Sequence, residues 1–275
     1  MTVRKKNSAG KNYKNRNSAK KSKKTPVTII TTIVVVIMTL LGWINKESLQ
    51  EYLFSEYGIF GSEEIYNDEL EVYALKDVDE ILSVVPAFTD QPYVVINDNV
   101  PFFTEEEKTT MEAIELFSEL DGLGRCGTAL ANVCKELMPT ADREDIGQVK
   151  PSGWKTAKYD HVDGKYLYNR CHLIGFQLTG ENANEKNLIT GTRYMNVDGM
   201  LPFENMIDDY VDETENHVLY RVTPIYEGDE LVARGVLMEA YSVEDQGEGI
   251  CFNVYAYNNQ PGVVIDYATG DSRAE

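Results

Sequence analysis

A short stretch in the middle of the chain combines residue types suited to hydrolysing a phosphodiester. Arg170 and His172 stand two positions apart, directly after the strand-like residues 166–168. A guanidinium can bind phosphate oxygens with paired donors, and an imidazole titrates near neutral pH, so it can accept a proton from water. A single histidine is more often structural than catalytic. Here the neighbouring arginine favours a catalytic role for His172.

Three oxygen-bearing side chains follow at intervals suited to one hard metal ion. Asn196 lies 24 positions after His172 and offers a neutral carbonyl oxygen, which leaves the charge of a cation for the phosphate. Glu204, eight positions further on, is expected to hold metal-bound waters. Asn187 is expected to orient the loop or to contact substrate. Each is a weak indicator alone, because asparagine is common in loops and glutamate favours helix N-termini, but the spaced set predicts a site for Mg²⁺, with Mn²⁺ as a substitute.

Two further arginines are candidates for binding substrate phosphate. Arg193 lies in Gly-Thr-Arg-Tyr and Arg125 in Gly-Arg-Cys-Gly. For Arg193 a salt bridge is the alternative, because the chain is rich in acidic partners, and the role of Arg125 is left open. No sequence feature predicts a small organic cofactor.

The charges are distributed very unevenly along the 275 residues. Residues 1–24 carry ten Lys/Arg and no acid, whereas the chain as a whole has a formal net charge of −19. Residues 125–193, which hold Arg170 and His172, carry ten Lys/Arg against eight Asp/Glu. A uniformly acidic surface would repel nucleic acid, because affinity for its backbone comes mostly from cations that neutralise phosphates. The distribution therefore predicts a local positive groove in an acidic body.

The N-terminus has the composition of a membrane anchor. Residues 27–44 contain 18 residues without a charge, and the cationic run precedes them. As a helix they would span about 27 Å, enough for a hydrocarbon core, with Trp43 at the interface and the cationic flank in the cytoplasm. A cleaved signal peptide is the alternative, but no small-x-small cleavage site is evident. We expect a single-pass anchor in the lipid bilayer, with the body of the protein outside the cell.

The chain divides into four predicted parts. A basic cytoplasmic tail (1–26) and the transmembrane segment (27–44) precede an acidic stalk (45–90) that includes a short helix at 46–57. The folded domain is expected to cover residues 91–272. Four cysteines have no metal-finger spacing, and buried free thiols are the favoured reading over a disulfide.

Local patterns predict an α+β domain with an antiparallel central sheet and packed helices. A first strand is expected at 92–97 and a three-stranded meander at 217–226, 231–241 and 250–257. A capping-box pattern at Thr104–Glu107 predicts a helix over 104–120, and a second helix is expected over 129–137. The clearest helix has Pro202 in its first turn and an apolar stripe with helical spacing: Phe203, Met206, Ile207, Tyr210 and Val211.

These motifs together resemble the DNA/RNA non-specific endonucleases with the ββα-metal fold, over about residues 91–272. The likeness rests on Arg170-Cys171-His172, on residues 187–196 and on Glu204, and it is strongest to bacterial membrane-anchored or secreted members. The resemblance implies that His172 is the general base, that Asn196 is the single protein ligand of Mg²⁺, and that Glu204 assists the metal waters, with Arg170 and Asn187 supporting. Two residues depart from the family pattern: Asn169 replaces the usual aspartate and Cys171 the usual glycine.

The resemblance implies metal-dependent hydrolysis of DNA, and of RNA as a second substrate, through backbone contacts that do not read sequence. Products would carry 5′-phosphates. The alternative is a tethered protein that keeps the fold and binds extracellular DNA without cutting it. The choice between DNA and RNA, the biological purpose and the oligomeric state are left open by the sequence.

Overall fold

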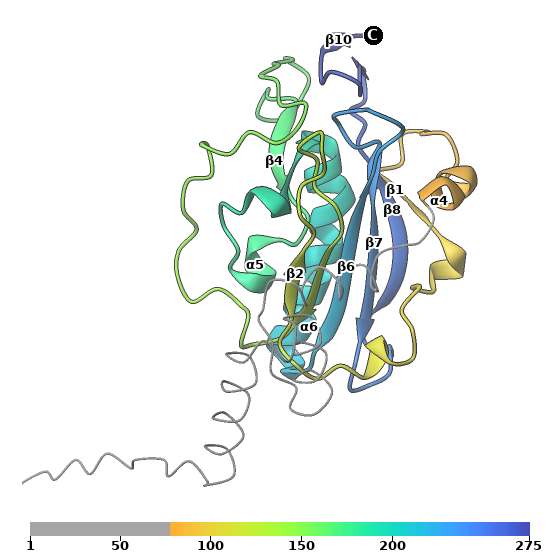
Figure 1. Ribbon diagram of the computed structural model, residues 1–275, viewed down its shortest axis with the longest axis vertical. Helices are drawn as coiled ribbons and strands as arrows, with labels where there is room; N and C mark the ends of the chain where they lie inside the picture. The colour runs from red at the N-terminus through yellow and green to blue at the C-terminus, as the bar shows by residue number, and fades with distance from the viewer. Residues whose placement is uncertain (1–77) are drawn as a thin grey trace, which may run out of the picture. The chain divides into compact units, whose positions relative to one another are not determined.

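The computed structural model describes residues 78–275, and an antiparallel sheet of six strands organises them (Figure 1). The strand order is β1-β8-β7-β6-β3-β2. These strands are β1 (Tyr93–Val95), β2 (Glu115–Phe117), β3 (Ala129–Val133), β6 (Val218–Ile225), β7 (Gly235–Ser242) and β8 (Cys251–Tyr257). The predicted meander is confirmed, because β6, β7 and β8 pair in sequence, each antiparallel to the next.

Both faces of this sheet are covered. The helix α6 (Leu201–Thr214) lies against one face, and its Phe203, Ile207 and Val211 belong to the main core together with alternate residues of β6, β7 and β8. On the other face, Ile81 of α4 (Val78–Val84) packs with Leu237 and Tyr255. Figure 1 shows α6 and α4 on opposite sides of β6, β7 and β8. Because neither face meets water, all eight residues of β6 are buried.

A second, two-stranded sheet carries the Arg-Cys-His motif. Strand β4 (Tyr168–His172) pairs antiparallel with β5 (Leu188–Thr192), and Arg170 lies opposite Thr190. Between them come the short helix α5 (Phe176–Thr179) and the 3₁₀ turn η3 (Glu185–Asn187). After β5 a π-helical segment, η4 (Met195–Met200), leads directly into α6. The remaining elements are the 3₁₀ turns η1 (Asn97–Asn99) and η2 (Glu107–Thr109) and the hairpin of β9 (Val263–Ile265) and β10 (Ser272–Ala274).

Two predicted helices are wrong. Residues 129–133 form the buried strand β3 and a turn follows it, whereas residues 104–120 contain only the turn η2 and the strand β2. The helix beginning near Pro202 is confirmed, although Met206 from its predicted apolar stripe is 46% exposed. The helix α4 falls within the stretch expected to be a stalk.

The basic tail, the apolar segment 27–44 and the helix expected at 46–57 lie outside the described residues. Within residues 78–275, no helix has the length and apolar character needed to cross a membrane. All four cysteines lie in this part and none forms a disulfide. Cys126, Cys134 and Cys171 are buried as expected, whereas Cys251 is exposed.

Candidate active site

The strand β4, the segment η4 and the start of α6 bring the predicted chemistry to one polar cavity. The cavity has a volume of about 250 Å³ and is lined by Arg143, Arg170, His172, Arg193, Asn196 and Glu204, among others. His172 comes from the end of β4, Asn196 from η4 and Glu204 from the first turn of α6. Two residues far apart in the chain, His172 and Asn196, thus face the same space.

The imidazole of His172 is held in one orientation by both of its nitrogens. Nε2 lies 2.8 Å from the main-chain oxygen of Asn182, and Nδ1 lies 3.3 Å from Nη2 of Arg143. Because a guanidinium only donates hydrogen bonds, Nδ1 accepts, and the proton of the neutral ring resides on Nε2. Burial, helped by the positive charge of Arg143, lowers the pKa of His172 to about 4, although the bond to Asn182 opposes the shift. The ring is therefore neutral, and its lone pair on Nδ1 accepts from Arg143, which lines the cavity.

The carboxamide of Asn196 is oriented by two neighbours from β4. The thiol of Cys171 donates to Oδ1 of Asn196 at 3.0 Å, and Nδ2 of Asn196 lies 3.5 Å from Oδ1 of Asn169. Burial raises the pKa of Cys171 well above its usual value, so the sulfur keeps the proton that it donates. Thus Cys171 and Asn169, which depart from the family pattern, together direct the amide oxygen of Asn196.

The carboxyl group of Glu204 is buried beside the main chain of Gly175. A Cβ at position 175 would lie 2.8 Å from Oε1 of Glu204, so a larger residue there would push the carboxyl group out of this position. Burial raises the pKa of Glu204 to about 8, although the Arg143 charge and a bond from the Gly175 main chain oppose the shift. The carboxyl group is held where it can accept hydrogen bonds from water in the cavity.

Arg170 supports the loop in front of the cavity as well as lining it. Its Nε donates to the carbonyl of Val149, its Nη2 donates to the carbonyl of Gly147 at 2.7 Å, and its Cζ lies 4.2 Å from the ring centroid of Trp154. Two of its three nitrogens are thus directed at the main chain. The side chain predicted to bind phosphate also holds the preceding loop against β4.

Asn187 lies behind the cavity. It is fully buried, its Oδ1 accepts from Ile174 N at 2.8 Å, and its Nδ2 donates to Ile174 O at 3.0 Å. Of the two roles considered for it, the geometry matches the orientation of a loop, because Ile174 lies two residues after His172.

The two outlying arginines differ in position. Arg193 lines the cavity, with Nη2 bonded to Asp163 at 2.8 Å. Arg125 is not part of the lining, because its guanidinium is bonded to Asp121 and to the main-chain oxygens of Gly228 and Glu230. The structure therefore brings Arg193, and not Arg125, to this cavity.

The sequence did not single out Arg143. This residue follows Pro139-Thr-Ala-Asp and contacts the imidazole of His172. It also lowers the pKa of His172 and opposes the rise in the pKa of Glu204, so its charge acts on both groups. The one sequence feature that could have pointed to Arg143 as a site residue is its place in the locally basic stretch 125–193.

The lining fits a hard divalent cation. Within the described residues, no three His, Cys, Asp or Glu side chains converge on a common metal position. A cation would instead take the oriented carbonyl oxygen of Asn196, with Glu204 placed to hold its waters and the remaining positions left to water and substrate. Magnesium accepts such an incomplete protein shell, because it retains several water ligands.

Comparison with known proteins places this geometry in a family. The family model for DNA/RNA non-specific endonucleases matches residues 106–244, which include every predicted site residue. A deoxyribonuclease of Streptococcus dysgalactiae subsp. equisimilis is 26% identical over 209 residues, covering 61% of this chain and 62% of that protein. The chain thus spans less than two thirds of the length of this curated relative.

Two solved structures are similar in fold. NucA from Streptococcus agalactiae, with a magnesium ion bound, superposes with a TM-score of 0.61 at 26% identity, covering 70% of this chain and 92% of NucA. The Sda1 nuclease, with a bound zinc ion, has a TM-score of 0.56 at 26% identity, covering 67% of this chain and 97% of Sda1. From the family match and this shared fold, we conclude that the chain belongs to the DNA/RNA non-specific endonuclease family.

Proposed function

We propose that this protein is a Mg²⁺-dependent, sequence-nonspecific endonuclease that hydrolyses phosphodiester bonds of DNA, with RNA as a second substrate. The observation that carries the proposal is the arrangement of His172 and Asn196. One polar cavity is lined by His172, whose neutral imidazole is anchored, and by Asn196, whose amide oxygen is held by the thiol of Cys171. The bound ions named for NucA and Sda1, magnesium and zinc, support a divalent cation here, and Mn²⁺ is expected to substitute.

The reaction proposed is direct attack of water on phosphorus. Nδ1 of His172, which accepts from Arg143 in this structure, takes the proton of the water once Arg143 turns to the phosphate. The bond from Nε2 to Asn182 keeps the ring in place as its charge develops. Arg143 and Arg193 line the cavity and are placed to bind the non-bridging oxygens. A cation at Asn196 would supply Lewis-acid charge to the phosphate and to the departing 3′ oxygen. The products carry 5′-phosphates, and no covalent enzyme intermediate is required.

The absence of sequence preference follows from the kinds of groups in the cavity. Cationic and amide side chains recognise phosphate and sugar, which are the same at every nucleotide. The locally basic stretch 125–193 carries these groups in an otherwise acidic chain.

The proposal is tested with supercoiled plasmid, purified full-length protein and Mg²⁺. We expect nicked and then linear DNA, complete loss of cutting in EDTA, and a decrease of at least about 100-fold in His172→Ala. His217→Ala is the matched control, because His217 lies outside the cavity and is bonded to Glu244. Plasmid that stays intact with the wild-type protein and Mg²⁺ would leave DNA binding without cleavage as the function.

The location of the activity is part of the proposal. We place the nuclease domain outside the cell, tethered to the bilayer by residues 27–44. The uncharged length of this segment and the ten cations before it support this orientation. Protease added to intact cells should release the nuclease activity. Activity that stays with the cells under conditions that digest a known surface protein would contradict this location.

A further inference from the structure

A second and larger cavity adjoins the candidate active site. It has a volume of about 620 Å³ and lies between the loop 145–157 and the start of β4. Asn169 and Arg170 line both cavities, so the two are neighbours that share a wall. A polynucleotide strand bound at the catalytic cavity would pass close to this second space.

The charge of the second cavity suits a polyanion. Lys150, Lys155 and Arg170 line it, and Asp145 is the one acid in its lining. Lys155 lies 3.3 Å from Asp271, but both side chains are largely exposed, so this pair is weak and its partner can be exchanged for a phosphate. A cationic hollow in a chain of net charge −19 points to an anionic ligand.

Three aromatic rings line the same cavity, and packing accounts for two of them. Trp154 packs against the small apolar cluster of Leu167, Tyr168 and Val263. Tyr166 is not part of that cluster and is 48% exposed. The Nζ of Lys158 lies over one face of this ring, 4.3 Å from its centroid, which leaves the other face for a base. An exposed ring beside cations is the combination that binds single-stranded nucleic acid, because bases stack on the ring while phosphates meet the cations.

We propose that this second cavity is a nucleotide-binding subsite for the strand that is cut, taking the nucleotides on one side of the scissile phosphate. In it a base stacks on Tyr166, and the flanking phosphates contact Lys150 and Lys155. The inference rests on the proposed function for the identity of the strand. Since stacking on Tyr166 needs an unpaired base, the subsite favours single-stranded or locally opened substrate over intact duplex.

The subsite is tested by binding without metal, so that no cleavage occurs. A fluorescent single-stranded 12-mer is titrated with the full-length protein in EDTA, and anisotropy gives the Kd. We expect Tyr166→Ala to raise the Kd about tenfold, Lys150→Gln to raise it by a smaller factor, and Tyr166→Phe to retain binding. The effect of Tyr166→Ala on an intact duplex of the same sequence should be smaller.

Matched controls separate this site from general effects. Phe102 is a 39% exposed aromatic beside Glu239 on the opposite face of the main sheet, and Lys135 is an exposed lysine paired with Asp212, as Lys155 is with Asp271. Phe102→Ala and Lys135→Gln should leave the Kd unchanged. Thermal melting of each variant tests its folding, and Tyr166→Phe serves as the folded comparison if the alanine variant is unstable.

Cleavage kinetics give a second readout. With Mg²⁺ and oligonucleotide substrate, Tyr166→Ala should raise KM and leave kcat close to the wild-type value, because Tyr166 does not line the catalytic cavity. Unchanged Kd and KM in a folded Tyr166→Ala variant would overturn the subsite and leave the nuclease function intact. Weaker metal-free binding by Tyr166→Ala would support the subsite even if the wild-type protein did not cut DNA. In that case the subsite would stand and the nuclease function would be overturned.

Discussion

The thiol of Cys171 lies 3.0 Å from the carbonyl oxygen of Asn196, the metal ligand in our proposal. This is the shortest of the contacts of the buried sulfur, so we assign the thiol proton to it. Removal of a group that orients a metal ligand typically costs roughly 10–100-fold in metal affinity. We therefore expect Cys171→Ala to weaken Mn²⁺ binding, measured by electron paramagnetic resonance without nucleic acid, by about tenfold. Cys171→Ser keeps a donor and should lie closer to the wild type, and an alanine variant that binds Mn²⁺ normally would contradict this role.

The depressed pKa of His172 predicts how activity depends on pH. The base must be neutral, and burial moves its pKa from 6.5 to about 4, so protonation should inactivate the enzyme only well below pH 6. The acid limb of kcat/KM at saturating Mg²⁺ should have its midpoint below that of an ordinary histidine. Arg143→Gln removes a nearby positive charge and should move the ring's midpoint upward, as followed by nuclear magnetic resonance in the metal-free protein. A wild-type ring that titrates at 6.5 would contradict the buried, neutral base.

At the scale of elements, the close contact of β4 and β5 depends on a glycine. A Cβ on Gly191 would lie 2.6 Å from Cβ of Cys171 and 2.8 Å from Cε of Met195. The methionine can move, but Cβ of Cys171 is fixed to the backbone of β4. Gly191→Ala should therefore lower the free energy of unfolding by about 1–3 kcal/mol, as expected for overpacking, measured by urea denaturation.

The cause of this loss can be checked with a second substitution. Cys171→Gly removes the atom that meets the new methyl group, so the double variant should recover part of the stability that Gly191→Ala loses. If the double variant loses the sum of the stabilities lost by Gly191→Ala and Cys171→Gly, the strain does not come from the contact between these two positions.

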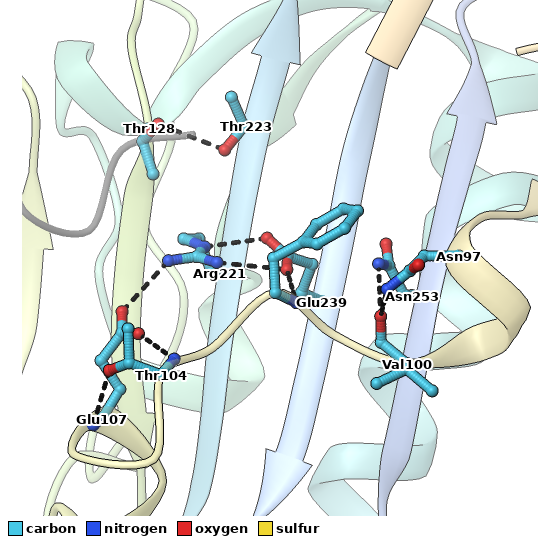
Figure 2. Close-up of polar contacts among 10 residues, drawn as sticks. Asn97, Val100, Thr104, Glu107, Thr128, Arg221, Thr223, Glu239 and Asn253 are labelled. Atoms are coloured by element: carbon cyan, nitrogen blue, oxygen red, sulfur yellow. Dashed lines mark hydrogen bonds and ion pairs between the residues drawn. The ribbon is translucent and has the colours of Figure 1, made fainter. Parts of the chain in front are cut away.

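At the scale of the whole described domain, a buried charge network holds the segment 97–110 to the sheet (Figure 2). Arg221 of β6 bonds both oxygens of Glu239 of β7, at 2.8 and 3.1 Å, and Oε1 of Glu107 at 3.2 Å. The same Glu239 accepts from the main chain of Phe102 at 2.7 Å. The network lies on the sheet face opposite α6, so it stabilises the framework without entering the active site.

Removal of the Arg221 guanidinium from this network should lower the stability of the fold strongly. Arg221→Met leaves two buried carboxylates without this partner, which predicts a loss of about 3–5 kcal/mol in the free energy of unfolding. Lys135→Met breaks an exposed pair with Asp212 and should cost less than about 1 kcal/mol. Urea denaturation followed by tryptophan fluorescence measures the free energy of unfolding of both variants. Equal losses in Arg221→Met and Lys135→Met would contradict the view that burial makes the Arg221 network the more important.

Local sequence patterns were sufficient for part of the fold. The strands β6, β7 and β8 and the helix α6 follow from short-range periodicity and from Pro202 in the first helical turn. The strand β3 was misread as a helix because it is covered on both faces and shows no alternation. The reciprocal bonds of the capping box between Thr104 and Glu107 do form, but only the 3₁₀ turn η2 follows them, and Glu107 also bonds Arg221, 114 positions away.

The candidate site, like the fold, was predictable from the sequence only in part. The sequence by itself determined which groups are present and their chemical character: an imidazole, an amide oxygen, a carboxyl group and a guanidinium at characteristic spacings. Only the tertiary structure decided that Arg143 contacts His172, that Cys171 directs Asn196, and that Arg125 is engaged outside the cavity. Residue type is local information, whereas these contacts depend on how separate segments pack, and no pattern within a single segment specifies that packing.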